Sequence, residues 1–248
     1  MILLTQNQML HRQHLCFIET HRSTVEEHGG NLYVSSEKDQ YTYAVLGEGG
    51  SDEVLQRCSA IHYLPWSGDW SARLVSNGFE PKEIIDYMLL ERSYENWRDT
   101  KNVNVRLATT DDDIELFTQI QGRSFIPDET TYQTWYPWFL QKNLLNSKRP
   151  EQQFHIGFVG ERPASTTFTI AFEGTLGIYA VGTLPEFRNR GVACTVMKRA
   201  LEHAAPSDTT MITLQTVGGS AAERLYFNLG FSSAFLVQVY RKAEATNS

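Results

Sequence analysis

A basic, glycine-containing turn in front of a helix is the stretch of this sequence best suited to chemistry. Residues 181–201 read VGTLPEFRNRGVACTVMKRAL, in which an expected strand ends, a proline-containing turn follows and an amphipathic helix begins. Gly191 and the small Ala193 let backbone N–H groups approach an anion closely, and a helix N-terminus adds partial positive charge. Arg188 and Arg190 place cations beside these amides, which suits a pyrophosphate. The residues therefore predict a phosphate-binding turn.

The glycine spacing distinguishes this turn from two common nucleotide-binding motifs. It lacks the three glycines of G-x-G-x-x-G and the Lys and Ser/Thr of the Walker pattern. The arrangement Arg188-x-x-Gly191-x-Ala193 after a strand instead resembles the Arg/Gln-x-x-Gly-x-Gly/Ala motif of the GNAT superfamily of N-acetyltransferases. In that superfamily the amides of the turn hold the pyrophosphate of coenzyme A. The resemblance spans residues 103–242 or so, and it implies acetyl-CoA as cosubstrate.

A second signature lies further along the chain. Residues 225–231, LYFNLGF, are similar to the superfamily's Leu-Tyr-x-x-x-Gly-Phe, in which a helix carries a tyrosine towards the thiol of coenzyme A. A phenol with an unperturbed pKa of about 10 can protonate a departing thiolate of pKa about 8.5. Tyr226 is therefore the candidate catalytic acid. The alternative for Tyr226 is a purely structural role, packing its helix onto the sheet.

The resemblance also implies a set of cofactor-binding residues. Val181, Gly182 and Thr183 end the strand that would pair with the pantetheine arm, with backbone groups of Val181 and Thr183 facing the thioester. Gly219 stands where the family often has an asparagine that contacts the pantetheine, so either the neighbouring Ser220 makes this contact or the contact is absent. The residues expected around the pyrophosphate are Arg188, Asn189, Arg190, Gly191, Val192, Ala193, Cys194 and Thr195.

The implied reaction is a direct transfer, in which an amine attacks the thioester and an oxyanion forms near the Val181 amide. Cys194 has no recognisable His and Asn partners, so we expect no covalent enzyme intermediate. An alkyl ammonium must lose a proton before it attacks, which requires a base. Glu173, Asp128 and Glu129 are the candidates, and each is also interpretable as a solvated turn carboxylate.

The acceptor is the least determined part of this interpretation. An aromatic-rich segment could form one wall of an acceptor pocket or belong to the core; it contains Tyr132, Trp135, Tyr136, Trp138 and Phe139. We expect an N-acetyltransferase acting on a primary amine of a small molecule or peptide. A non-catalytic acetyl-CoA or acyl-CoA binding module, used as a sensor or scaffold, is the alternative. A longer acyl donor is also left open.

The order of expected elements predicts an α/β (α+β) fold with a GNAT-like mixed, mostly antiparallel sheet flanked by helices. A strand at residues 103–108 precedes a helix that Thr110 caps, with three aspartates in its first turn. A helical region follows on both sides of Pro137, and then three antiparallel strands begin at Gln153. After the turn at Gly191 come a helix, a strand, a helix at residues 221–229 and a last strand.

A polar stretch, ERSYENWRDTKNVN at residues 91–104, is the best candidate domain boundary. It separates a smaller N-terminal α/β domain, residues 1–98, from a GNAT acetyltransferase domain, residues 99–248. A helix, glycine, phenylalanine and strand pattern around Leu74 and Phe79 is similar to the one around Leu225 and Phe231. The first domain is therefore interpretable as a degenerate GNAT-like half. The alternative is that the pattern is a common local arrangement of helix, turn and strand. Three roles of the first domain stay open: capping of the acceptor cleft, homodimer formation and stabilisation of the second domain.

Composition limits the partners. The 248 residues carry a net charge of −7, which argues against nucleic acid and suits a cationic amine. No apolar run reaches the roughly 18 residues of a membrane span, and the first residues do not resemble a secretory signal, so no membrane partner is expected. Cys16, Cys58 and Cys194 are too widely separated for a zinc pattern, and His11 and His14 lack a further ligand pair. We expect a cytoplasmic protein without a metal.

Overall fold

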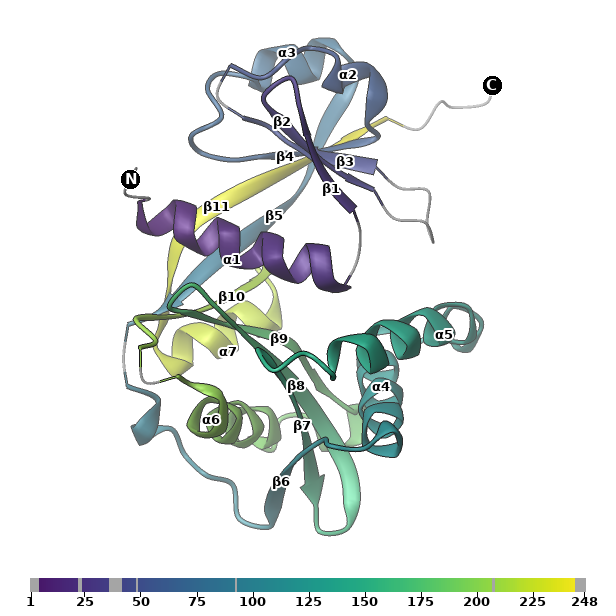
Figure 1. The fold of residues 1–248 in the computed structure, drawn as a ribbon, viewed down its shortest axis with the longest axis vertical. Coiled ribbons are helices and arrows are strands. Elements are labelled where there is room, and N and C mark those ends of the chain that lie inside the picture. The colour runs from purple at the N-terminus through teal and green to yellow at the C-terminus, as the bar shows by residue number, and fades with distance from the viewer. Residues whose placement is uncertain are drawn as a thin grey trace. The chain divides into compact units, whose positions relative to one another are not determined.

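The structure, a computed structural model, describes residues 5–21, 24–35, 42–47, 49–91, 93–206 and 208–243 (Figure 1). The chain forms two compact units that are interleaved in sequence. The first unit comprises Met1–His21, Leu89–Leu214 and Asn228–Phe231. The second comprises Arg22–Met88, Gln215–Phe227 and Ser232–Ser248. Each unit contains both strands and helices.

The sheet of the first unit has the strand order β10-β9-β8-β7-β6. Neighbouring strands from β6 to β9 are antiparallel, whereas β9 and β10 run parallel. These strands are β6 (Val103–Leu107), β7 (Gln152–Val159), β8 (Arg162–Phe172), β9 (Thr175–Thr183) and β10 (Met211–Val217), the last of which belongs to this unit as far as Leu214. The predicted mixed, mostly antiparallel sheet is confirmed.

Alternation along β7 sends side chains to opposite faces of this sheet. Phe154 and Ile156 pack with Phe117 of α4 (Asp111–Phe125), in a cluster that Leu144 of α5 (Glu129–Asn146) borders. On the other face, a Cβ at Gly157 would meet Val196 of α6 (Val192–Ala204) at 2.2 Å. Helices α4 and α5 therefore cover one face and α6 covers the other (Figure 1).

The helix starts of the first unit follow from local capping. Thr110 caps α4, since its side chain accepts from the N–H of Asp113, and the Asp113 carboxylate reaches back to the N–H of Thr110. This confirms the predicted cap. Asp128 caps α5 in the same way, through the N–H of Thr131. Pro137 lies inside α5, which continues on both sides of it as predicted.

Helix α1 (Gln6–His21) packs within the first unit, although it comes from the start of the chain. The Gln13 amide donates to the carbonyl of Ile170 at 2.8 Å and also contacts the Tyr179 hydroxyl. Near the other end of the helix, His21 and Gln152 are hydrogen-bonded at 2.6 Å. The boundary expected between residues 98 and 99 stays a prediction. In the compact units, α1 belongs to the same unit as Leu89–Leu214.

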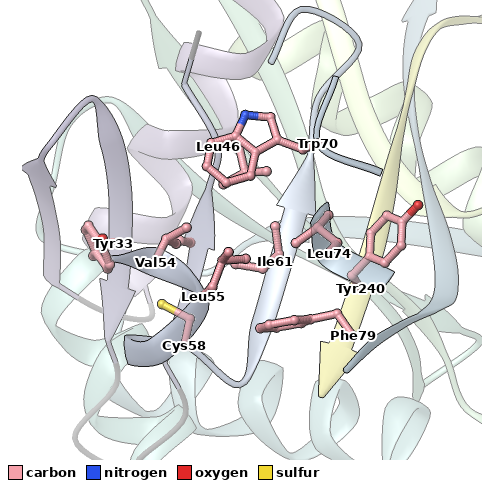
Figure 2. Close-up of a cluster of buried hydrophobic side chains, with 11 residues drawn as sticks. Tyr33, Leu46, Val54, Leu55, Cys58, Ile61, Trp70, Leu74, Phe79 and Tyr240 are labelled. Carbon is pink, nitrogen blue, oxygen red and sulfur yellow. The ribbon is translucent and has the colours of Figure 1, made fainter. Parts of the chain in front are cut away.

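The second unit has the strand order β1-β2-β3-β4-β11-β5. Its strands are β1 (Thr24–His28), β2 (Asn31–Ser35), β3 (Thr42–Val45), β4 (Ala60–Tyr63), β5 (Phe79–Leu90) and β11 (Phe231–Lys242). Its helices are α2 (Val54–Arg57), α3 (Ser71–Ser76) and α7 (Ala221–Leu229). Figure 2 shows its core, where Ile61 of β4 meets Leu55 of α2, Leu74 of α3 and Phe79 of β5.

Candidate active site

Strand β9 has a free edge beyond its first residues. In the described chain it pairs with β10 only over Thr175–Gly177, which face Met211–Thr213. The pairing with β8 then shifts between Thr166 and Phe168, and Ala180 adopts a φ of 48°. Such a bulge bends the strand and re-aims its backbone groups. The edge that lies past the β10 pairing therefore offers N–H and C=O groups to an extended ligand.

Hydroxyl groups on β8 hold this bulge. Ser165 Oγ donates to the carbonyl of Gly182 at 2.6 Å, and Thr166 Oγ1 donates to that of Ala180 at 3.1 Å. Thr167 Oγ1 donates to the carbonyl of Tyr179 at 3.2 Å. All three hydroxyl residues are fully buried. The sequence predicted only a strand for this run, although consecutive hydroxyl residues in an apolar strand are a usable signal.

The turn after β9 begins α6 as predicted. A short 3-10 turn, Pro185–Phe187, precedes Arg188, and Gly191 is the N-cap of α6 with a φ of 75°. No side chain of the described residues caps this helix. The first N–H groups of a helix have no partner inside it, so those of Val192, Ala193 and Cys194 remain for an anion. Their use by a cofactor stays a prediction.

Several predicted cofactor residues have side chains that are buried or occupied by contacts within the protein. Thr195 is buried and its hydroxyl accepts from the N–H of Thr100 at 2.8 Å. Cys194 Sγ lies 3.7 Å from the carbonyl of Arg98, and burial raises the pKa of its thiol. Val192 is buried in the core. These residues can therefore serve a phosphate only through backbone N–H groups.

The two arginines of the turn differ in what they contact. Arg188 donates from Nε to the carbonyl of Thr183 and from Nη2 to the carbonyl of Ser124, both at 2.9 Å. It thereby joins the end of β9 to the end of α4. The Arg190 guanidinium lies 6.0 Å from the ring centroid of Phe187, and both Arg190 and Asn189 are exposed. Asn189 adopts a φ of 60°, which asparagine tolerates better than most residues.

A cavity of about 520 Å³ lies between the end of α4 and the turn after β9. It is lined by Arg123, Ser124, Phe125, Ile126, Pro127, Glu129, Leu184, Pro185, Glu186 and Arg188. Ser124 Oγ is buried and has no hydrogen-bond partner among the described residues. A Cβ at Gly182 would meet that hydroxyl at 3.1 Å. Sequence reasoning missed Ser124, because nothing local marks a serine at a helix end as a ligand contact.

The carboxylates considered as bases are all held by donors. Glu173, in the turn that precedes β9, is 52% exposed and pairs with Arg12 at 3.0 Å. It lies at the opposite end of β9 from Thr183. The hydrogen bond to Thr131 lowers the pKa of Asp128, and that to Gln133 lowers the pKa of Glu129. Carboxylates with lowered pKa values are weak proton acceptors.

The aromatic segment divides into two parts. Tyr132 is buried against Gly122 and lies under the Arg123 guanidinium, 4.5 Å from its ring centroid. The partly exposed rings of Trp135, Trp138 and Phe139 contact one another, with centroids 5.3 to 6.1 Å apart. Tyr132 therefore belongs to the packing of α4 against α5, and the other three rings form a separate cluster.

Ser220 and Tyr226 belong to the second unit. Ser220 Oγ accepts from the N–H of Glu223 at 3.1 Å and lies 3.3 Å from Thr216 Oγ1. Its hydroxyl thus caps α7. Tyr226 lies in α7 with 6% of its surface exposed, and burial raises its phenol pKa well above the usual value. The phenol is therefore protonated at neutral pH, and its role as the catalytic acid stays a prediction.

No metal centre emerges from the described part of the chain, where no group of three or more His, Cys, Asp or Glu side chains is placed to hold an ion. His11 is buried, and its burial lowers the pKa to about 4. Cys16 is half-buried, and its burial raises the thiol pKa to about 11. Across the described residues, no helix is both long and apolar enough to cross a membrane.

The mixed sheet and the strand-to-helix turn place the protein in the class of GNAT-like folds. Residues 114–231 match the acetyltransferase (GNAT) family, and this part of the chain is a GNAT acetyltransferase domain. The matched segment includes the turn at Gly191 and Tyr226. No curated protein matches the sequence.

Solved structures share this fold over most of the chain. A GCN5-related N-acetyltransferase from Kribbella flavida has a TM-score of 0.71 at 13% identity, covering 98% of this chain and 98% of that chain. A GCN5-related N-acetyltransferase from Sphaerobacter thermophilus has a TM-score of 0.63 at 13% identity, covering 88% and 81%. A tandem GNAT protein from the clavulanic acid biosynthesis pathway has a TM-score of 0.60 at 10% identity, covering 88% and 80%. At such identities the likeness concerns the fold.

Proposed function

We propose that this protein is an N-acetyltransferase that moves the acetyl group of acetyl-CoA to a primary amine of a small molecule or peptide. The observation that carries the proposal is the uncapped start of α6 directly after the free edge of β9. An extended amide-containing chain that ends in a pyrophosphate needs these two features in this order. Membership of the matched segment in the GNAT family supports acetyl transfer in general.

In this proposal, coenzyme A is bound mainly by main-chain groups. The pantetheine amides would pair with Val181 and Thr183, and the N–H groups of Val192, Ala193 and Cys194 would hold the pyrophosphate. Arg188 would order this surface, because its hydrogen bonds fix the carbonyls of Thr183 and Ser124. Arg190, which is exposed, would contribute its charge to the anion.

The proposed reaction has one bond-forming and one bond-breaking step. The nitrogen lone pair of the neutral amine attacks the thioester carbonyl, and the N–H of Val181 stabilises the oxyanion that forms. The C–S bond then breaks, the sulfur takes the proton of the Tyr226 phenol, and the new amide nitrogen gives up its extra proton to a base or to water. Burial raises the pKa of the phenol, so it is protonated at neutral pH and still holds a proton when the C–S bond breaks.

We place the acceptor, or the part of the ligand next to the thioester, in the cavity that includes Ser124. Ser124 lines this cavity, its buried hydroxyl has no hydrogen-bond partner among the described residues, and the ion pair of Arg123 with Glu129, at 3.2 Å, borders the same space. A polar ligand suits such a lining better than a wholly apolar one. The net charge of −7 favours the approach of a cationic amine.

A thiol-release assay with acetyl-CoA and a panel of primary amines tests this function. We expect release that depends on both the amine and the enzyme, with little release from acetyl-CoA alone. If calorimetry shows that coenzyme A binds but no amine causes thiol release, the protein is a binding module and not an enzyme. Parallel assays with propionyl-CoA and longer acyl-CoA donors identify the preferred acyl group.

A further inference from the structure

Thr100, which lies shortly before β6, holds the backbone of the turn in front of α6. Its hydroxyl donates to the carbonyl of Arg190 at 3.3 Å. Its N–H donates to Thr195 Oγ1 at 2.8 Å, and this hydroxyl in turn donates to the carbonyl of Gly191 at 3.4 Å. Two successive carbonyls of the turn are therefore fixed by Thr100, one of them directly and the other through Thr195.

Fixing these two carbonyls also orients the N–H groups next to them. A peptide unit is planar and trans, so its N–H points in the direction opposite to its C=O. The carbonyl of Arg190 shares a peptide unit with the N–H of Gly191, and the carbonyl of Gly191 shares one with the N–H of Val192. Both N–H groups therefore point away from the donors that hold the carbonyls. In the proposed function, this is the direction from which the pyrophosphate approaches the helix.

Asp99, the residue before Thr100, is held by two cations of α6. Its Oδ2 lies 3.2 Å from Lys198 Nζ and 3.2 Å from Arg199 Nη2. Lys198 is only 9% exposed, and it also donates to the carbonyl of Trp97 at 2.9 Å. A mostly buried ammonium needs such partners, because leaving its charge unpaired is costly. The two cations therefore hold this part of the chain along α6.

Trp97 anchors the other end of the segment. It is 7% exposed, and its Nε1–H donates to the carbonyl of Leu229 at 2.8 Å. The centroid of its ring lies 6.1 Å from that of Phe231, and both partners belong to the same compact unit as the segment. Residues 97–100 are thus fixed at each end and in the middle, which makes them a rigid support for the turn.

We propose that Thr100 is a positioning residue for coenzyme A, that it acts by orienting the N–H groups of Gly191 and Val192, and that Asp99 holds it in place. Neither Thr100 nor Asp99 needs to touch the cofactor. The functional half of this inference rests on the proposed function, because it takes the turn as the pyrophosphate site. The structural half, that Thr100 and Asp99 fix the turn, is testable without any cofactor.

Thr100→Val and Thr100→Ser separate the hydroxyl from the shape of the side chain. Valine keeps the branched shape and loses the donor to Arg190, whereas serine keeps the donor. We expect Thr100→Val to weaken calorimetric binding of coenzyme A about tenfold, and Thr100→Ser to bind within about twofold of the wild type. In the thiol-release assay, KM for acetyl-CoA should rise in Thr100→Val while kcat changes little. Equal binding by all three proteins, or equal weakening by valine and serine, would overturn the role of the hydroxyl.

Asp99→Ala is a test in which the sign of the effect decides. A carboxylate repels a pyrophosphate, so by charge alone its removal should strengthen binding of coenzyme A. The positioning role predicts the opposite, a weakening of about two- to fivefold, because Lys198 loses a partner and the segment loosens. Glu202→Ala is the matched control, since it removes a carboxylate that pairs with Arg199 at 2.6 Å within α6 itself, and binding should not weaken. Binding by Asp99→Ala as tight as by Glu202→Ala would contradict the role of Asp99.

NMR order parameters of the Gly191 and Val192 N–H groups, measured without ligand, test the structural half. We expect values of about 0.85, typical of a rigid backbone, in the wild type and Thr100→Ser, and a clear fall in Thr100→Val and Asp99→Ala. Equal values in all four proteins would overturn this half, and Thr100→Val decides if Asp99→Ala does not fold. Lower order with unchanged binding of coenzyme A would overturn the functional half. If the wild type binds no coenzyme A, the proposed function fails, and the order parameters still decide whether Thr100 fixes the turn.

Discussion

Thr100 Oγ1 lies where a side chain at Gly191 would begin, since a Cβ built on Gly191 would be 2.5 Å from that oxygen. Gly191 also has a φ of 75°, which disfavours any residue with a Cβ. Thr100 is held in place, because its hydroxyl donates to the carbonyl of Arg190 at 3.3 Å and its N–H donates to Thr195. The start of α6 is thus clamped by a distant segment, and the turn keeps its shape only with glycine.

Gly191→Ala should therefore disturb the turn through both backbone strain and a collision with Thr100. We expect a loss of about 1–3 kcal/mol in the free energy of unfolding and at least about tenfold weaker binding of coenzyme A. Gly160→Ala is the control, since Gly160 has a φ of 61° and open space around its Cβ position. It should cost about 1 kcal/mol and leave binding unchanged. Urea unfolding and calorimetry measure both effects.

Ser124→Ala separates ligand binding from stability. Its hydroxyl has no partner in the described chain, so its removal should change the free energy of unfolding by less than about 1 kcal/mol. The same change should raise KM for the ligand that occupies the neighbouring cavity. Ser165→Ala is the matched comparison, because Ser165 Oγ donates to Gly182 at 2.6 Å, and its loss should cost about 1–3 kcal/mol. An unchanged KM in Ser124→Ala would remove Ser124 from the site.

Tyr226→Phe should remove the proposed proton donor while keeping the ring that packs α7. We expect kcat to fall by about 10²- to 10⁴-fold with little change in KM for acetyl-CoA. Tyr63→Phe, in the same unit, removes a hydroxyl that donates to the carbonyl of Gly68 at 2.7 Å and should leave kcat unchanged. Equal kcat values for Tyr226→Phe and the wild type would show that Tyr226 only packs its helix.

Buried histidines should make the protein sensitive to acid. His155 is fully buried, and burial and the nearby His203 lower its pKa to about 4. The unfolded chain binds this proton at a pKa of about 6.5, so stability should fall as the pH drops from about 6.5 towards 4, by a few kcal/mol. His155→Gln should reduce this fall, and exposed His28→Asn should not. Denaturant unfolding at pH 7 and pH 5 measures the difference.

The features that the sequence predicts well have local determinants. Thr110 and Asp113 lie three residues apart, and together they fix the start of α4. Gly191 and the apolar spacing after it fix the start of α6 in the same way. The features that sequence reasoning missed depend on distant partners. Thr100 and Arg190 are 90 positions apart, and Gln13 reaches Ile170 across 157 positions.

The bulge in β9 and the burial of the Asp86 carboxyl also depend on distant parts of the chain. A register shift depends on how two strands pair. The sequence of the hydroxyl run in β8 is equally compatible with a regular strand pairing that has no bulge. Asp86 follows two isoleucines in a strand, where alternation alone does not show that its carboxyl is buried. Such contacts emerge only once the elements are placed in space.

Titration of coenzyme A into the wild-type protein by calorimetry tests the central claim most directly. The uncapped amides at the start of α6 should give saturable binding at one site per chain, weakened at least about tenfold by Gly191→Ala and unchanged by Gly160→Ala. A flat titration of the wild type would contradict the assignment of this turn as a pyrophosphate site.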